Sequence, residues 1–258
     1  MKIAAIQHDI EWEDGAATRK HLVPMIADAA SGGARLIVLS EMYATGFSMD
    51  PARVAEESGG DNEQFLIDQA RAHQVWLIGS IAQWSPVAGE TGRPPRGVNV
   101  AVVAGPDGQL HHYTKIHPFS YAGEHERYDA GTDFLTVSIE GLRVSVFICY
   151  DLRFADEFWQ RASDTDLYVL PANWPEPRRE HWRVLLRARA IENQAYVLGC
   201  NRVGKVDKLN HTGDSAIIDP LGRVLVEASV VEAVLAAEVS ADEVSRVRAR
   251  FPFLPDRR

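Results

Sequence analysis

The sequence has little cysteine, no surplus of positive charge and no long apolar run. Two of its 258 residues are cysteines, Cys149 and Cys200, so a disulfide framework is not expected and a reducing compartment is the simpler setting. The formal net charge of −9 argues against nucleic acid as a partner, because that role requires clustered Lys and Arg. Apolar runs such as residues 36–39 are far shorter than the roughly 20 residues that a membrane-spanning helix needs.

The first residues also lack the apolar segment and small-residue cleavage site of a secretory signal. They predict a β-strand instead. We therefore expect a cytoplasmic protein that binds neither membranes nor nucleic acid. Cys200 ends an apolar run and is interpreted as a small buried hydrophobic residue. Cys149 requires a separate explanation.

Short runs rich in Val, Ile and aromatic residues predict strands, because Gly, Pro, Asn or Asp bound them. Two turns, at residues 105–108 and 219–222, predict hairpins. The predicted strands are residues 2–7, 35–40, 75–81, 98–104, 109–113, 134–139, 143–148, 167–170, 196–200, 215–218, 223–227 and 233–239.

Helical segments lie between many of these strands. Residues 61–73 begin with a capping-box spacing between Asp61 and Gln64, and residues 16–31 contain Pro24, which should start or kink that helix. Further helices are predicted at residues 154–161, 178–193 and 241–250, and a surface loop at residues 85–97.

Strands that alternate with helices indicate an α/β fold, and the two hairpins indicate that the sheet is mixed. We find no repeat, low-complexity tract or change of composition that would mark a domain boundary. We therefore expect a single domain over residues 1–258, with residues 241–258 as a C-terminal helix and tail.

Three predicted strands are followed by reactive side chains, Glu41, Lys115 and Cys149. Ligands of α/β proteins bind beyond the carboxyl ends of strands, so the three groups could meet in one cleft. Such a trio suits acyl transfer from an amide: a thiolate attacks, a carboxylate moves the proton, and an ammonium with a backbone N–H stabilises the oxyanion. A helix following Cys149 would favour the thiolate if its N-terminus pointed at the thiol.

Each residue of the trio also has a simpler interpretation. A cysteine at a strand end is usually buried, a glutamate there is usually a solvated loop residue, and a lysine alone is uninformative. A papain-like Cys–His pair also remains open, because the chain has nine histidines. Spacing alone does not decide between these interpretations.

Other cofactor and catalytic motifs are missing. The chain has no Gly-rich dinucleotide or phosphate-binding motif and no Gly-x-Ser-x-Gly elbow. Histidines 111, 112, 117 and 125 match no known zinc spacing, so we interpret them as surface or hydrogen-bonded residues. We expect neither a metal nor a cofactor.

The sequence around the trio resembles that of the nitrilase superfamily, the carbon–nitrogen hydrolases. Residues 40–47 (SEMYATGF), 113–119 (YTKIHPF) and 147–154 (FICYDLRF) are similar to the base, lysine and nucleophile motifs of that family. The resemblance continues in order through residues 171–175, 187–193, 213–215 and 219–222, and so covers nearly the whole chain.

This resemblance implies a four-layer α-β-β-α sandwich with mixed sheets, usually assembled as a homodimer. It also implies Glu41 as the general base, Lys115 as the oxyanion stabiliser and Cys149 as the nucleophile. A second glutamate of the family is expected to orient the lysine. Glu124 fits that role best, with Glu126 as the alternative.

Within the family, residues 149–154 and 172–175 resemble the omega-amidase branch. This implies hydrolysis of the terminal amide of small dicarboxylate monoamides, 2-oxoglutaramate and 2-oxosuccinamate, to the 2-oxo acid and ammonia. Arg153 is the candidate cation for the distal carboxylate, unless it pairs with Asp151 or Asp156. The Tyr150 N–H is the second oxyanion donor, and the candidate pocket walls are Tyr43, Phe119, Tyr121 and Trp174.

Two other functions use the same trio. An N-carbamoyl-amino-acid hydrolase, or another aliphatic amidase or nitrilase, would share Glu41, Lys115 and Cys149. A non-catalytic binding protein on the same fold is the remaining alternative, although it would be expected to have lost one of the three. Alkylation of Cys149 distinguishes the binding protein, and substrate profiling distinguishes the enzymes.

Overall fold

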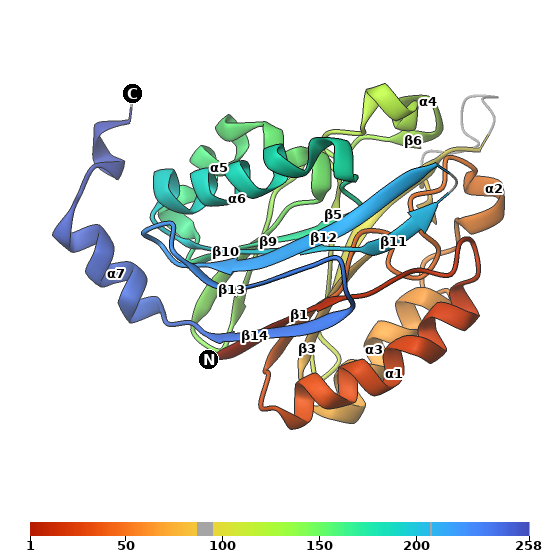
Figure 1. The fold of residues 1–258 in the computed structure, drawn as a ribbon, viewed down its shortest axis with the longest axis horizontal. Helices are drawn as coiled ribbons and strands as arrows, with labels where there is room; N and C mark the ends of the chain where they lie inside the picture. The colour runs from red at the N-terminus through yellow and green to blue at the C-terminus, as the bar shows by residue number, and fades with distance from the viewer. Residues whose placement is uncertain (87–94, 207, 258) are drawn as a thin grey trace.

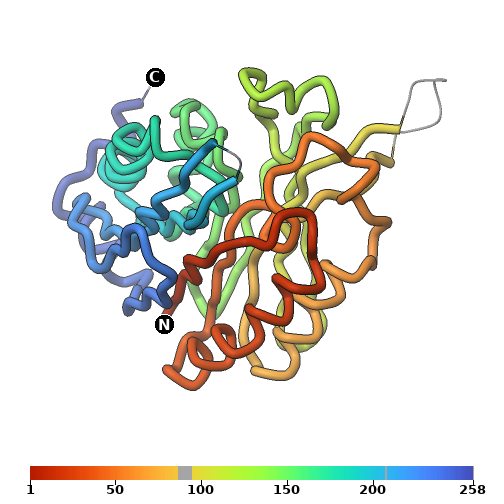
Figure 2. The backbone as a smooth tube through the Cα atoms, turned by 45° about the vertical axis from the view of Figure 1, so that its right-hand side comes forward, coloured from red at the N-terminus to blue at the C-terminus, as the bar shows by residue number. Residues whose placement is uncertain are grey.

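The computed structural model describes residues 1–86, 95–206 and 208–257. Within these residues two seven-stranded mixed sheets stack face to face (Figures 1 and 2). Helices cover the outer face of each sheet. The expected α-β-β-α sandwich is therefore confirmed.

The first sheet is formed mainly by the N-terminal half of the chain. Its parallel strands β1, β2 and β3 are flanked by antiparallel partners on both sides. The order is β14 (Ala233–Glu238), β1 (Lys2–Gln7), β2 (Leu36–Val38), β3 (Trp76–Trp84), β4 (Gly97–Ala104) and β5 (Leu110–Thr114), with β6 (Tyr128–Asp129) beside β4.

The second sheet is formed by the C-terminal half. Strands β8, β9 and β10 are parallel, and the flanking strands are antiparallel. The order is β11 (Val203–Val206), β12 (Leu209–Ile218), β10 (Tyr196–Asn201), β9 (Leu167–Ala172), β8 (Leu142–Val146) and β7 (Leu135–Ile139), with β13 (Val224–Ser229) beside β12.

Helices α1 (Gly15–Ser31) and α3 (Asp61–His73) cover the first sheet, and α5 (Ala155–Arg161) and α6 (Arg179–Asn193) cover the second. No helix among the described residues is long and apolar enough to cross a membrane. The remaining elements are α2 (Pro51–Val54), α4 (Glu124–Arg127), the terminal helix α7 (Ala241–Arg250), and the 3-10 turns η1 (Ser120–Ala122), η2 (Cys149–Arg153), η3 (Ala162–Asp164), η4 (Glu176–Arg178) and η5 (Leu254–Asp256).

Apolar side chains on both faces of the central strands explain the layers. On β2, Leu36 and Val38 point into the core between the sheets, whereas Ile37 points towards α1 and α3. The two sheets also touch through Cys200 on β10, whose thiol lies 3.3 Å from the carbonyl oxygen of Ile6. Cys200 is therefore buried, as its apolar context predicts.

One of the two alternatives for Pro24 is wrong, while a kink at Pro24 stays a prediction, and the predicted capping box is wrong. Pro24 does not start α1, which begins at Gly15 behind an Asp14 cap; Pro24 lies on its exposed side, where water can solvate the unpaired carbonyl. The N-terminus of α3 has no capping box. The carboxylate of Glu56, from outside the helix, accepts the N–H of Asn62 at 3.0 Å instead. Of the predicted loop over residues 85–97, residues 87–94 lie outside the described residues.

Both predicted hairpins are confirmed. Strands β4 and β5 pair antiparallel across residues 105–109, and β12 and β13 pair antiparallel across residues 219–223. The first hairpin positions the site described next, because β5 ends immediately before Lys115.

Candidate functional site

The three reactive side chains predicted at strand ends meet at the same end of the two stacked sheets. Glu41 follows β2 and Lys115 follows β5, both in the first sheet. Cys149 begins the turn η2 that follows β8 in the second sheet. Glu41 and Lys115 are 0 % and 1 % exposed and Cys149 is 8 % exposed, so the thiol alone reaches a surface.

Lys115 is held between two buried carboxylates. Its ammonium lies 2.7 Å from Oε1 of Glu41 and 2.9 Å from Oε2 of Glu124. The side-chain amide of Asn99 donates to both carboxylates, at 2.9 Å to Glu41 and 3.2 Å to Glu124. The backbone N–H of Asn173 binds the second oxygen of Glu41 at 2.9 Å. Hydrogen bonds therefore fix both oxygens of Glu41.

Glu124, and not Glu126, is the second glutamate beside the lysine. Both lie on α4, but the side chain of Glu124 is fully buried against Lys115, whereas Glu126 is exposed. Glu124 also accepts the backbone N–H of Phe119, which joins α4 to the loop after Lys115.

The charged groups in this cluster shift one another's pKa values. Burial alone would lower the pKa of Lys115, but the carboxylates of Glu124 and Glu41 outweigh burial and raise it well above its usual value. Burial raises the pKa of Glu124, and the charge of Glu41 adds to this increase while Lys115 opposes it. Lys115 is therefore a permanent cation shared by two carboxylates.

Cys149 lies in a strained turn. Its φ angle of 45° belongs to the left-handed region, which is uncommon for residues other than glycine. The side chain of Asp151 stabilises the turn by accepting the backbone N–H of Ile148 at 2.9 Å. The turn places the thiol beside Glu41, whose negative charge acts on it.

Burial raises the pKa of the Cys149 thiol well above its usual value, and the negative charge of Glu41 raises it further while Lys115 lowers it. The resting group is therefore a protonated thiol. The sequence suggested that a following helix would favour the thiolate, but η2 and α5 are short, and burial and Glu41 outweigh any such effect. The arrangement instead suits transfer of the thiol proton to Glu41.

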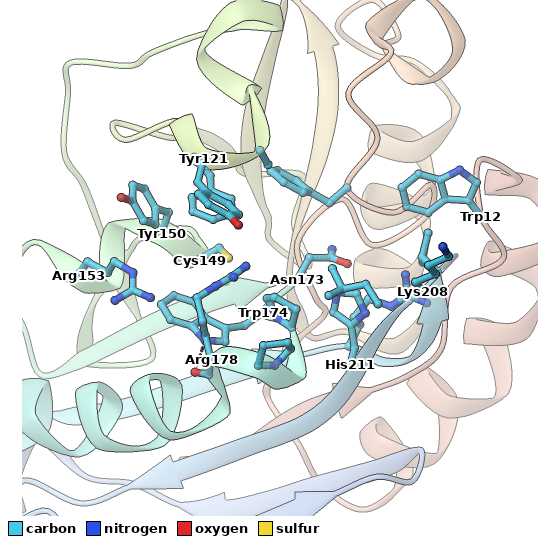
Figure 3. Close-up of a pocket in the computed structure, with 18 residues that line it drawn as sticks. Trp12, Tyr121, Cys149, Tyr150, Arg153, Asn173, Trp174, Arg178, Lys208 and His211 are labelled. Carbon is cyan, nitrogen blue, oxygen red and sulfur yellow. Dashed lines mark hydrogen bonds between the residues drawn. The ribbon is translucent and has the colours of Figure 1, made fainter.

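Cys149 opens into a cavity of about 610 Å³ (Figure 3). Phe119 and Tyr121 form one side, and the Tyr150 ring is tilted against Phe119 at a ring distance of 4.8 Å. Trp174 forms another side. Four predicted substrate contacts, Tyr150, Phe119, Tyr121 and Trp174, therefore line the cavity, as does Arg153.

Tyr43 does not line this cavity, so that prediction is wrong. It follows Glu41 by two residues, but its ring is fully buried against Phe65 beneath α3. Its hydroxyl donates to the backbone oxygen of Asn62 at 2.6 Å. The chain turns sharply at Met42, whose φ is 41°, and this turn directs Glu41 and Tyr43 to different places.

Among the described residues, Arg153 is held by aromatic packing and not by a carboxylate. Its guanidinium lies 4.8 Å from the ring centre of Trp174 and 3.1 Å from Nδ1 of His181. Asp151 and Asp156 are both among the described residues, and neither forms an ion pair with Arg153. The charge of Arg153 therefore stays available at the wall of the cavity.

The cavity is strongly cationic. No Asp or Glu is found among its described lining residues, which include the cations Arg153, Arg178, Arg202 and Lys208. Of these, Arg202 pairs with Asp9. The guanidinium of Arg178 lies 5.2 Å from the ring centre of Phe119, and no carboxylate binds it among the described residues. Such a lining favours an anionic ligand.

Sequence reasoning missed several of these contacts. Asn99 is a polar residue in an otherwise apolar strand, a pattern that could have indicated a buried role. Arg178, Arg202 and His211 had no signal, because their positions depend on how η4, β11 and β12 surround the cavity. Two of the singled-out histidines are hydrogen-bonded, His112 to Glu63 and His117 to Asp151. Among the described residues no three His, Cys, Asp or Glu side chains are grouped as a metal site would require.

Comparisons with known proteins identify one family of similar proteins. The family model for carbon–nitrogen hydrolases matches residues 2–249. Omega-amidase YafV of Escherichia coli strain K12 is 37% identical over 259 residues, which span 99% of this chain and 96% of that protein. The 2-oxoglutaramate amidase of Bacillus subtilis strain 168 is 32% identical, over 98% of this chain and 96% of that protein.

A solved structure is similarly close. The protein XC1258 from Xanthomonas campestris, a CN-hydrolase superfamily protein with an arsenic adduct in its active site, superposes with a TM-score of 0.92 at 35% identity. The match covers 100% of this chain and 97% of that chain. Nit3 of Saccharomyces cerevisiae, a nitrilase superfamily member, superposes with a TM-score of 0.86 at 25% identity, over 98% of this chain and 94% of that chain.

Proposed function

This chain belongs to the carbon–nitrogen hydrolase family, and we propose that it hydrolyses the terminal amide of 2-oxoglutaramate and 2-oxosuccinamate to the 2-oxo acid and ammonia. The family assignment made from the sequence motifs is thus confirmed, and the protein is a hydrolase of carbon–nitrogen bonds other than peptide bonds. One observation supports the proposed substrates most strongly. A thiol beside a buried Glu41–Lys115–Glu124 cluster opens into a cavity whose described lining contains cations and no carboxylate.

In the first half of the proposed reaction, Cys149 attacks the amide carbon as its proton passes to Glu41. The thiol lies beside Glu41, and because its pKa is raised it keeps its proton until Glu41 takes it. Lys115 and the Tyr150 N–H stabilise the oxyanion of the tetrahedral intermediate. Glu41 then returns the proton to the nitrogen, the C–N bond breaks, and ammonia leaves a thioester on Cys149.

In the second half, water attacks the thioester carbon. Glu41 takes a proton from this water, and Lys115 again faces the oxyanion. The C–S bond breaks, the sulfur regains the proton from Glu41, and the carboxylic acid departs. Glu124 acts throughout as a positioning residue, because its hydrogen bond of 2.9 Å keeps the Lys115 ammonium in place.

The distal carboxylate of the substrate needs a cation, and Arg153 and Arg178 are the two that we propose. Arg153 is positioned by Trp174 and His181, and Arg178 packs against Phe119 and Tyr121. A guanidinium binds a carboxylate through two parallel hydrogen bonds. Tyr150, Phe119, Tyr121 and Trp174 then form the apolar walls.

The test is ammonia release from 2-oxoglutaramate, measured beside glutamine, an N-carbamoyl amino acid and a simple nitrile. We expect release from the oxo-amide to exceed the others and to vanish in Cys149→Ala. Cys200→Ala is the matched control and should retain activity, because that thiol is buried between the sheets. Release from the carbamoyl compound or nitrile alone would reject the omega-amidase assignment and keep the trio.

The cation assignment has its own test. Arg153→Gln and Arg178→Gln should raise KM for 2-oxoglutaramate while changing little for butyramide, which has no carboxylate. Losing a hydrogen bond to a charged group costs about 1.5–3 kcal/mol, so each effect should be roughly tenfold to a hundredfold. Arg183→Gln, on the outer face of α6, is the control. Equal losses with both substrates would assign these arginines a structural role.

We further propose a single hydrolase domain over residues 1–258, a cytoplasmic location and a homodimer. The two unpaired cysteines suit a reducing compartment. Val184 and Ile191 on α6 are 60% and 49% exposed, and such apolar side chains suit a contact with a second copy. Light scattering on the purified protein tests the dimer, and a monomer at micromolar concentration would reject it.

A further inference from the structure

The cavity extends well beyond Cys149. A volume of about 610 Å³ is typical of sites for drug-sized ligands and exceeds what a small monoamide such as 2-oxoglutaramate fills. Figure 3 shows two groups of residues, with Asn173 between them. Cys149, Tyr150 and Arg153 lie on one side, and Trp12, Lys208 and His211 lie on the other. We call the second group, together with Arg202 and Leu209, the distal arm.

Arg202 is the most deeply buried cation of the distal arm. Its side chain is 0% exposed, yet it lines the cavity. Its Nε donates to the carbonyl oxygen of Val203 at 2.9 Å, and its Nη2 donates to Asp9. Its Nη1 is buried and has no partner among the described residues. A buried donor without a partner is costly, so an acceptor from a ligand is a natural complement.

His211, on β12, lies beside Arg202 and is 9% exposed. Its Nδ1 is likewise buried without a partner among the described residues. Burial lowers the pKa of His211 to about 3, and the positive charge of Arg202 contributes, so the ring is neutral at physiological pH. With its proton on Nδ1, the ring has one unpaired buried donor, as Arg202 has at Nη1.

The rest of the distal arm suits a carbon chain that ends in an anion. Trp12 and Leu209 provide apolar surface, and Lys208 adds a second positive charge. No carboxylate among the described residues lines this part of the cavity to compete for the donors. The arm is therefore apolar along its walls and donor-rich at Arg202 and His211.

We propose that Arg202 Nη1 and His211 Nδ1 form a second carboxylate subsite, which accepts dicarboxylate monoamides with longer carbon chains than 2-oxoglutaramate. This rests on the proposed function, because the amide of the longer substrate reacts at Cys149 by the same steps. The carboxylate of a short monoamide binds at Arg153 and Arg178. That of a long one extends past Asn173 to the distal arm, with its methylene groups against Trp12 and Leu209.

The experiment compares the monoamides of glutaric, adipic, suberic and sebacic acids with 2-oxoglutaramate. His211→Phe should lower kcat/KM for the suberic and sebacic monoamides roughly tenfold to a hundredfold, the effect of losing one hydrogen bond to a charged group. It should leave kcat/KM for 2-oxoglutaramate unchanged, and that result also shows that the variant folds. His211→Asn keeps a donor near Nδ1 and should restore part of the loss. Arg153→Gln is the matched control and should lower kcat/KM for 2-oxoglutaramate more than for the suberic and sebacic monoamides.

A binding measurement separates this inference from the proposed function. Suberate, which has no amide, should bind Cys149→Ala protein, and His211→Phe in that background should weaken the binding roughly tenfold to a hundredfold. Turnover of 2-oxoglutaramate without turnover of the long monoamides, or long-chain turnover that His211→Phe leaves intact, would overturn the distal subsite alone. Suberate binding without turnover of any monoamide would retain the subsite as an anion site and reject the proposed amidase.

Discussion

Asp151 accepts the backbone N–H of His117 at 2.9 Å, and this hydrogen bond joins the turn that contains Cys149 to the loop that follows Lys115. The other carboxylate oxygen accepts the N–H of Ile148 at 2.9 Å and the hydroxyl of Tyr113 at 2.8 Å. One buried carboxylate thus sets the position of the thiol relative to the ammonium, although it contacts neither.

This geometry predicts that Asp151→Asn lowers kcat more than it changes KM. An asparagine keeps the volume but can accept hydrogen bonds at only one of its two terminal atoms. The turn that contains Cys149 and the loop after Lys115 therefore lose part of their connection. Loss of a hydrogen bond to a charged group should lower the free energy of unfolding by about 1.5–3 kcal/mol. Steady-state kinetics and urea unfolding measure both effects. Asp156→Asn, on the exposed side of α5, should change neither.

Lys115→Met should lower kcat strongly and destabilise the fold. The substitution removes the oxyanion donor, which is worth about 10²–10³-fold in kcat, and leaves Glu41 and Glu124 buried without a cation. Breaking a buried ion pair costs about 3–5 kcal/mol in urea unfolding. Adding Glu124→Gln should recover part of this stability but no activity. Lys20→Met, exposed on α1, is the control, and a loss as large as that of Lys115→Met would contradict the argument.

Glu41→Gln should lower the pKa of Cys149 while abolishing turnover. Burial is the largest cause of the raised thiol pKa and remains, but the negative charge of Glu41 is lost and Lys115 stays. The pKa should therefore move towards the usual cysteine value of about 8.5. Ultraviolet absorbance of the thiolate across pH measures it, with Cys149→Ala as the baseline. A pKa that stays fixed or rises would show that Glu41 does not face the thiol.

Tyr43 and Tyr121 should behave oppositely. Tyr43→Phe removes a buried hydrogen bond to Asn62 and should cost about 1 kcal/mol of unfolding free energy without changing KM. Tyr121→Ala removes an 85% exposed ring from the cavity wall and should change KM while leaving stability nearly constant. Kinetics and thermal unfolding of both variants decide the matter. A KM effect from Tyr43→Phe would return that residue to the pocket wall.

Much of the fold could be predicted from the sequence because its patterns are local. Strand β1 and helix α7 have the predicted bounds, and both hairpins follow turns with Pro and Gly at the required positions. The motifs around Glu41, Lys115 and Cys149 predicted the family and the reactive trio. The two-residue strand β6 and strand β11 were missed, since their pairing with β4 and β12 gives no local periodicity.

The sequence by itself therefore determined the order of most strands and helices, the family and the three reactive residues at strand ends. The tertiary structure alone decided that Glu124 and not Glu126 faces Lys115, that Tyr43 lies in the core, and that the cavity contains Arg178, Arg202 and His211. The reason is physical. These placements depend on contacts between segments far apart in the chain, such as the Asn173 N–H bound to Glu41, 132 residues away, and no local pattern records them.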